Sequence, residues 1–171
     1  MSGKRRERGF LPFRVVNRHD QPDHDPGLQR HHLLPLQLLA RTSFERMFAQ
    51  LGDRRERFED FRENGLLLPC REAAARRLGM PLHRGPHRHY SELVIERVGQ
   101  IESAWSQVRL RDEGAAACEA RMRLALLQRA LRRFLLDSRR RIVLNRADPW
   151  REDSAFVELD AMVDALWGST D

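Results

Sequence analysis

The chain has 171 residues, of which 41% are hydrophobic and 33% are charged. This length suits one domain with a real hydrophobic core and leaves little for a second independent domain. No apolar run is long enough to cross a bilayer, and no signal-peptide core follows the basic N-terminus, so we expect a cytoplasmic protein without a membrane partner. The two cysteines, Cys70 and Cys118, fit no metal motif or disulfide framework, and we expect free, buried thiols.

The net charge of +6 and the isoelectric point of about 10.7 favour an anionic partner such as nucleic acid. Positive charge is concentrated in residues 1–18 and 121–146, whereas residues 147–171 are strongly acidic. Nearly all of the basic residues are arginine, which can bind a phosphate through two parallel hydrogen bonds. A compositional bias of the source genome would explain the arginine excess equally well.

The N-terminal third begins with residues 1–9, which are basic and predicted to be disordered. Residues 10–16 are predicted to form a short strand or an extended arm, and residues 17–28 a surface loop. The loop contains two histidines and three aspartates, at His19, Asp20, Asp23, His24 and Asp25. A solvated loop is favoured over a metal site there, because no regular scaffold surrounds these side chains.

Two short strands are predicted, at residues 31–34 and 66–68, with a helix between them. Thr42-Ser43-Phe44-Glu45 has the form of a capping box, and Gly52 fits the position after the end of that helix. The expected buried side of the helix consists of Phe44, Met47, Phe48 and Leu51. Phe58 and Phe61 are expected to anchor the charged loop that follows. Asn64-Gly65 is predicted to form a turn before the second strand, because both residues tolerate positive φ.

Four helices are predicted after the second strand. A short one spans residues 72–78 and ends at Gly79, and a long one starts near Gly85-Pro86. Its apolar stripe consists of Tyr90, Val94, Val98, Ile101, Trp105 and Val108. A further helix covers residues 115–136, with Met122, Leu126, Leu127, Leu131 and Leu135 roughly in phase. The last helix is predicted at residues 154–167.

The segment Gln29-Arg30-His31-His32-Leu33-Leu34-Pro35 carries adjacent histidines at the start of an apolar run. An Asn-Gly turn, a second strand and a His-x3-His pair, His83 and His87, follow in that order. This order resembles the ββα-metal nucleases of the HNH/endonuclease VII superfamily, and more narrowly the AHH group, over about residues 28–101. Arg30 stands where the group has alanine, at a position that flanks the chemistry and should supply no ligand.

The resemblance implies an α+β protein, mostly α, with a ββα-metal (HNH-like) core. We expect a basic arm and loop at residues 1–27, the nuclease domain at 28–110, and a helical extension packed on it at 111–171. The implied activity is metal-dependent endonuclease cleavage of nucleic acid, with DNA favoured over RNA. Members of the AHH group are often toxin domains of bacterial polymorphic secretion systems, so delivery to a target cell and an immunity-protein partner are also implied.

The resemblance assigns a role to each of five residues. His31, His83 and His87 would bind one divalent ion, His32 would be the general base, and Asn64 would hold the hairpin and orient that base. The residues agree with this, because neighbouring side chains of a strand point to opposite faces and residues four apart share a helix face. Imidazole ligands favour Zn²⁺ or Ni²⁺, with Mn²⁺ and Mg²⁺ still open.

Phosphate contacts are expected from Arg30, Arg84, Arg88 and Tyr90. Each predicted site residue also has a simpler interpretation as a core histidine, a solvated arginine or, for Tyr90, the first residue of the core stripe. Two other functions stay open. One is a non-catalytic basic nucleic-acid-binding protein with a structural His-bound metal, which would have no use for His32. The other is a partner-binding module whose acidic helix, residues 152–167, covers the protein's own basic helix or another chain.

Overall fold

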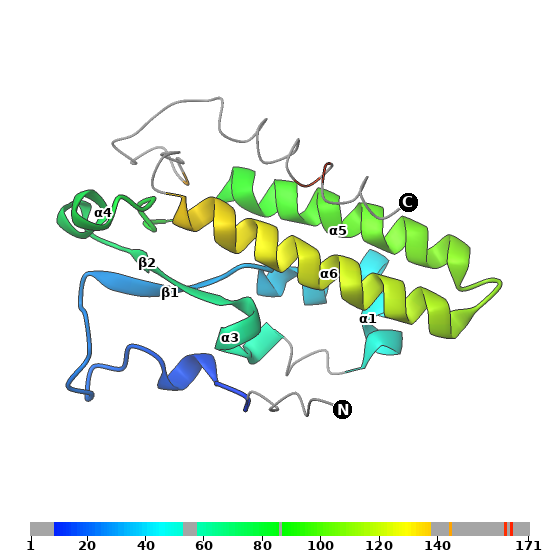
Figure 1. The fold of residues 1–171 in the computed structure, drawn as a ribbon, viewed down its shortest axis with the longest axis horizontal. Helices are drawn as coiled ribbons and strands as arrows, with labels where there is room; N and C mark the ends of the chain where they lie inside the picture. Colours follow the sequence, from blue (N-terminus) through cyan, green and yellow to red (C-terminus); the bar gives the residue numbers. More distant parts are fainter. Residues whose placement is uncertain are drawn as a thin grey trace, which may run out of the picture.

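The computed structural model describes residues 9–52, 58–85 and 87–137, together with Leu144, Val163 and Ala165. The predictions for the N-terminal tail, for Pro86 and for the last helix, apart from Val163 and Ala165, therefore lie outside the described residues. The architecture is α+β and mostly helical, as expected, with one small antiparallel sheet (Figure 1). Among the described helices, none is long and apolar enough to cross a membrane.

Strands β1 (Leu28–His32) and β2 (Gly65–Pro69) pair antiparallel, with His31 opposite Leu66 and His32 opposite Gly65. Both predicted strands are thus present, although β1 begins three residues earlier than expected. Leu33 and Leu34 come after β1 and are fully buried, so the end of the strand is fixed in the core. Within the described part of the chain the sheet has two strands, so β1 pairs with β2 along one of its edges.

The long connection between the strands contains a 3-10 turn, η2 (Leu36–Ala40), and the helices α1 (Thr42–Leu51) and α3 (Phe61–Asn64). Helix α1 buries the four predicted apolar residues and ends at Gly52, whose φ is 65°. The capping box was wrong, because Thr42 is already the first helical residue and Arg41 precedes it without a side-chain cap. The apolar face, rather than a cap, stabilises this helix.

The predicted Asn64-Gly65 turn was also wrong. Asn64 is the last residue of α3, and Gly65 starts β2 with an ordinary φ of −106°. Glycine is needed for space instead, since a Cβ at position 65 would lie 2.2 Å from Cδ2 of Phe61. The ring of Phe61 therefore packs directly onto the backbone of β2.

Helix α4 (Glu72–Leu78) ends at Gly79, in the left-handed conformation, as predicted. Helices α5 (Arg88–Val108) and α6 (Glu113–Leu136) follow and lie side by side along the molecule (Figure 1). The predicted stripe of α5 is buried, except that Val108 is only partly covered. In α6 the predicted phase was partly wrong, because Met122 is exposed and alanines at positions 116, 117 and 120 complete the buried face instead.

The N-terminal segment forms a 3-10 turn, η1 (Phe13–Val15), rather than the predicted strand or extended arm. The loop that follows is held by Asn17, whose side-chain amide donates to the carbonyls of Asp25 and Leu28 and accepts from the Asp25 amide. Both cysteines are free, as expected, but Cys118 is exposed and Cys70 only half-buried, so their predicted burial was wrong.

Candidate active site

Three imidazoles from three parts of the chain meet beside β1. His31 lies in β1, His83 in the loop after α4, and His87 immediately before α5. The ring centroids are 4.9 Å apart for His31 and His83, 5.6 Å for His31 and His87, and 4.4 Å for His83 and His87. One nitrogen from each ring lies within 4.8 Å of the other two, which makes this triad a candidate metal site.

Backbone geometry, rather than a shared helical turn, brings His83 and His87 together. The His83 amide donates to the carbonyl of Pro69 at 2.6 Å, so the loop runs alongside the end of β2. Gly85 then reverses the chain at a φ of 84°, a conformation that glycine tolerates, and His87 is the residue before the first turn of α5. The expectation of two histidines on one helix face was therefore wrong, although their proximity was predicted correctly.

The triad has the chemical character of a metal site. Nε2 of His31 and Nδ1 of His87 are buried, and neither has a hydrogen-bond partner among the residues that the structure describes. Burial, reinforced by the other histidines, lowers the pKa of His31 from 6.5 to about 2. Burial and then the charge of His87 lower the pKa of His83 to about 4, and burial lowers the pKa of His87. Neutral rings with unpaired buried nitrogens are what a divalent transition ion requires, so the residues fit such an ion.

Gln29 orients one of these ligands. Its Oε1 lies 3.2 Å from Nδ1 of His83, and because a carbonyl oxygen only accepts, Nδ1 carries the proton. The lone pair of His83 is therefore on Nε2. Gln29 precedes His31 by two residues, so both share one face of β1. A partner of this kind fixes the tautomer and direction of a ligating histidine.

His32 lies on the opposite face of β1, away from the triad. Its ring stacks on Phe13, with centroids 3.8 Å apart and planes inclined by 5°. Among the described residues, its Nε2 is buried and has no hydrogen-bond partner. Burial lowers the pKa of His32, the charge of Glu59 opposes this and that of Arg30 adds to it. The ring is consequently in the neutral form, which a general base needs.

The rings of Phe13 and Phe61 form an aromatic wall that supports His32. Phe13 meets Phe61 edge-to-face at 5.0 Å, and the ring of Phe61 fills the space left by Gly65, directly opposite His32 in the sheet. The sequence did not predict that Phe13 stacks on His32, because Phe13 was only part of an expected strand or extended arm. Its contact with His32 depends on the path of η1 in space, and no local pattern reports that path.

Asn64 is fully buried and every polar atom of its side chain is used. Oδ1 accepts from the Leu34 amide and from Nε2 of Gln128, while Nδ2 donates to the carbonyls of Leu34 and Phe58. Its backbone carbonyl also accepts from the Leu33 amide. Asn64 therefore joins the chain after β1 to the α3 region and to α6. Its place is inside the scaffold, and no hydrogen bond to the ring of His32 is present.

The structure corrects one predicted phosphate contact. Tyr90 is fully buried, and its hydroxyl donates to the carbonyl of Leu33 at 2.8 Å, so it ties α5 to the end of β1 and does not face a substrate. Arg84 and Arg88 are exposed close to the triad. Arg30 is exposed as well, and its Nη1 donates to the Phe13 carbonyl, which places it beside the aromatic wall.

Part of the basic stretch 121–146 has a structural use. Arg121 donates to the carbonyl of Leu51 at the end of α1, and Arg132 to the carbonyls of Arg62 and Glu63 at the end of α3. Arginines at helix C-termini satisfy the free carbonyls and interact favourably with the helix dipole. These two guanidinium groups hold the scaffold together, so some of their N–H donors are already used within the protein.

Comparisons with known proteins extend this description. No curated protein and no solved structure matches the chain. Residues 13–131 match the model of a family described as a nuclease family of the HNH/ENDO VII superfamily with conserved AHH. The match covers more than half of the chain and spans His31, His32 and the rest of the triad. The protein therefore belongs to the AHH family of nucleases.

Proposed function

We propose that the protein is a metal-dependent endonuclease that hydrolyses phosphodiester bonds in nucleic acid, with DNA as its first candidate substrate. One observation carries the proposal: three neutral imidazoles converge on one face of β1 while His32 stands on the other face. A structural metal site would use the triad and leave His32 without a role. A hydrolase needs both.

The metal would be held by His31, His83 and His87, and it would supply positive charge for the phosphate and for the leaving oxygen. His32 accepts a proton from a water molecule as the water oxygen bonds to phosphorus. The bond between phosphorus and the leaving sugar oxygen then breaks, and that oxygen takes a proton from solvent. Phe13 keeps the ring of His32 in one orientation, and Asn64 keeps the end of β1 in place.

Cleavage of supercoiled plasmid and of a structured RNA tests this proposal. The wild type, His32→Ala and His87→Ala are compared with Mg²⁺, Mn²⁺, Ni²⁺ or Zn²⁺, and with EDTA. We expect His32→Ala to lower the rate by about 10²–10⁴-fold, the usual contribution of a general base, and EDTA or His87→Ala to abolish cleavage. The matched control is His89→Ala, an exposed histidine of the same segment that lies outside the triad.

The outcomes separate the candidate functions. Wild-type protein that binds nucleic acid but cuts neither substrate with any ion would favour the non-catalytic binding protein. Full activity in His32→Ala would show that another group is the base. If His89→Ala loses as much activity as His87→Ala, the effect is not specific to the triad, and the proposed metal site is contradicted.

We also propose that the nuclease acts as a bacterial toxin, on the basis of its resemblance to toxin domains. Expression of the wild type in a bacterial host should then stop growth, whereas His32→Ala should be tolerated at equal protein levels. Equal growth of both strains would remove the toxin role and leave the nuclease proposal intact. An immunity protein remains a proposed partner on the same basis.

A further inference from the structure

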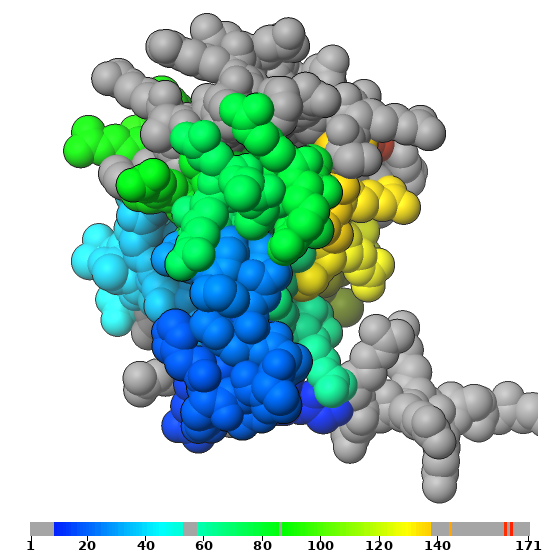
Figure 2. Space-filling model, turned by 90° about the vertical axis from the view of Figure 1, so that its left-hand side faces the viewer, coloured from blue at the N-terminus to red at the C-terminus, as the bar shows by residue number. Residues whose placement is uncertain are grey.

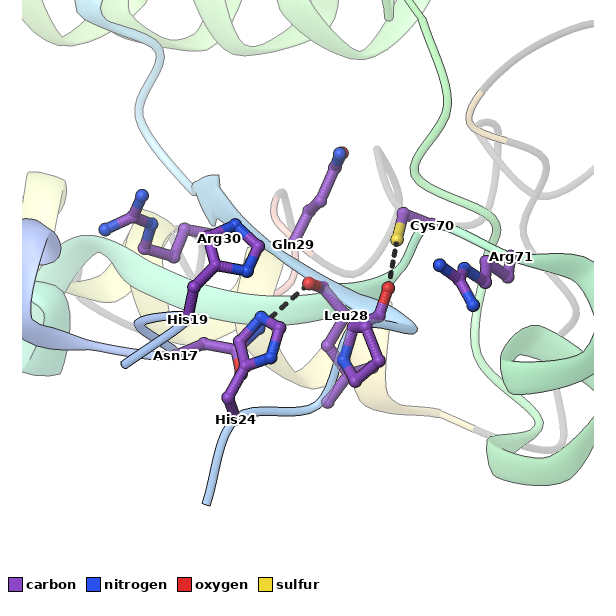
Figure 3. Close-up of a pocket in the computed structure, with 9 residues that line it drawn as sticks. Asn17, His19, His24, Leu28, Gln29, Arg30, Cys70 and Arg71 are labelled. Atoms are coloured by element: carbon purple, nitrogen blue, oxygen red, sulfur yellow. Dashed lines mark hydrogen bonds between the residues drawn. The ribbon is translucent and has the colours of Figure 1, made fainter. Parts of the chain in front are cut away.

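A second concave site lies at the start of β1, outside the triad. It has a volume of about 420 Å³, which is in the range of small-molecule sites. Figure 3 shows the imidazoles of His19 and His24 at one end and Cys70 and Arg71 at the other, with β1 behind them. On the face of the molecule shown in Figure 2, this N-terminal loop (blue) adjoins the segment that contains α4 (green).

The lining is suited to an anion. None of the nine lining residues is acidic, the imidazole centroids of His19 and His24 lie 4.3 Å apart, and the exposed Arg71 lies at the other end of the pocket. Two of the three aspartates of the same loop are engaged elsewhere. Asp20 pairs with Arg18, and the carboxylate of Asp25 accepts from the Gly27 amide and from Arg77. The pocket therefore presents donors and ring faces without an opposing carboxylate.

The pocket is aligned with the candidate general base. Leu28 and Arg30 line it and share a face of β1 with His32, because alternate residues of a strand point the same way, and Gln29 of the triad face lines it as well. The rise of a strand places Leu28 about 13 Å from His32. Arg30 stands between them, with its guanidinium at the Phe13 carbonyl beside the ring of His32. A nucleic-acid strand that reaches His32 can thus pass Arg30 and enter the pocket.

We propose that this pocket binds one unpaired nucleotide of the substrate strand, with its phosphate at Arg71 and its base against His19 and His24. The volume exceeds what a phosphate alone needs, and aromatic or imidazole rings are the surfaces on which unpaired bases stack. A metal ion is a poorer occupant, because among the described residues the only group of three potential ligands is the triad. The proposal rests on the nuclease function and adds a preference for single-stranded or locally opened substrate.

Binding is tested in the full chain carrying His32→Ala, so that turnover does not interfere. Thymidine 5′-monophosphate and inorganic phosphate are titrated separately while the imidazole resonances of His19 and His24 are followed by NMR. We expect saturable shifts with the mononucleotide, at least 10-fold weaker binding of phosphate, and at least 10-fold weaker mononucleotide binding after Arg71→Ala. Arg111→Ala is the matched control, since this exposed arginine lies in the turn between α5 and α6, at the other end of the molecule (Figure 1).

Cleavage kinetics provide the second arm. Arg71→Ala and His24→Ala, in the otherwise wild-type chain, should raise KM for a single-stranded oligonucleotide about 10-fold and leave kcat unchanged. Unaltered KM in both variants, or imidazole resonances that do not move with the mononucleotide, would overturn the pocket proposal while the nuclease proposal stands. Equal affinity for phosphate and mononucleotide would also overturn it. Mononucleotide binding that is sensitive to Arg71→Ala, in a chain that cuts nothing, would support the pocket and reject the nuclease.

Discussion

The two faces of β1 contact different parts of the molecule, although β1 has only five residues and their side chains alternate between the faces. On one face, Gln29 and His31 meet His83 and His87 in a site where His31 is buried and the other two histidines are half-buried. On the other face, Arg30 lines the pocket and donates a hydrogen bond to the Phe13 carbonyl, and His32 stacks on the ring of Phe13. One strand thus supplies a ligand to one environment and a candidate base to another, and the pairing with β2 keeps the two histidines from exchanging places.

The largest expected effect separates the two faces directly. Added Zn²⁺ should raise the Tm of the wild type and of His32→Ala by about 5–11 °C when free metal is 100 times Kd, because binding to the folded state stabilises it. His87→Ala should show no such rise, since one of three ligands is missing. The measurement is thermal unfolding with and without Zn²⁺, with His89→Ala as control. A lost response in His32→Ala would mean that the two faces are not independent.

Asn64→Ala should weaken the scaffold beneath both faces. The substitution leaves the Leu34 amide and carbonyl, the Phe58 carbonyl and the Gln128 amide without their partner in a buried place. We expect the free energy of unfolding to fall by about 3 kcal/mol. Gln128→Ala removes only one of these bonds and should cost about 1 kcal/mol.

Urea unfolding of the metal-free protein provides this measurement. If Asn64→Ala keeps wild-type stability but loses cleavage, then Asn64 acts in the chemistry rather than in the scaffold.

Gly65→Ala should disturb the His32 face and spare the triad. The added Cβ displaces the ring of Phe61, which supports Phe13 and, through it, His32. If the ring of His32 moves by about 1 Å, the cleavage rate should fall by up to about 10²-fold. The rise in Tm caused by Zn²⁺ should persist, because the triad is unchanged.

Phe13→Leu tests the same wall at its other end and should lower the rate in the same direction. Wild-type cleavage in both variants would show that the stack does not position His32.

Gln29→Ala is expected to have the smallest effect on cleavage and to act on the metal site through His83, although Gln29 also lines the pocket. Loss of the bond to Nδ1 of His83 should weaken metal affinity by about 10–100-fold. Cleavage at saturating metal should stay close to wild type, because His32 and its support are unchanged. Metal titration followed by activity and by equilibrium dialysis measures both quantities. Unchanged metal affinity would show that Gln29 does not orient His83.

Local patterns in the sequence were sufficient for much of this protein. Adjacent histidines in an extended segment must point to opposite faces, and apolar residues at helical spacing must share a side, so both strands and helices α1, α4 and α5 were predicted close to their observed positions. The set of three histidines was recognised from the order of motifs and from the family resemblance. The division into residues 1–27, 28–110 and 111–171 stays a prediction, and the family match crosses both of its boundaries.

Tertiary packing decided the features that no local pattern reports. Asn64-Gly65 has the composition of a turn, yet Asn64 is held by residues up to 64 positions away and Gly65 makes room for Phe61. Tyr90 has a hydroxyl suited to phosphate, but burial directs it to Leu33. Residue types and their period determine which side chains can share a face. Contacts between distant segments determine which of those side chains become buried, paired or available to a substrate, because each depends on how separate elements pack.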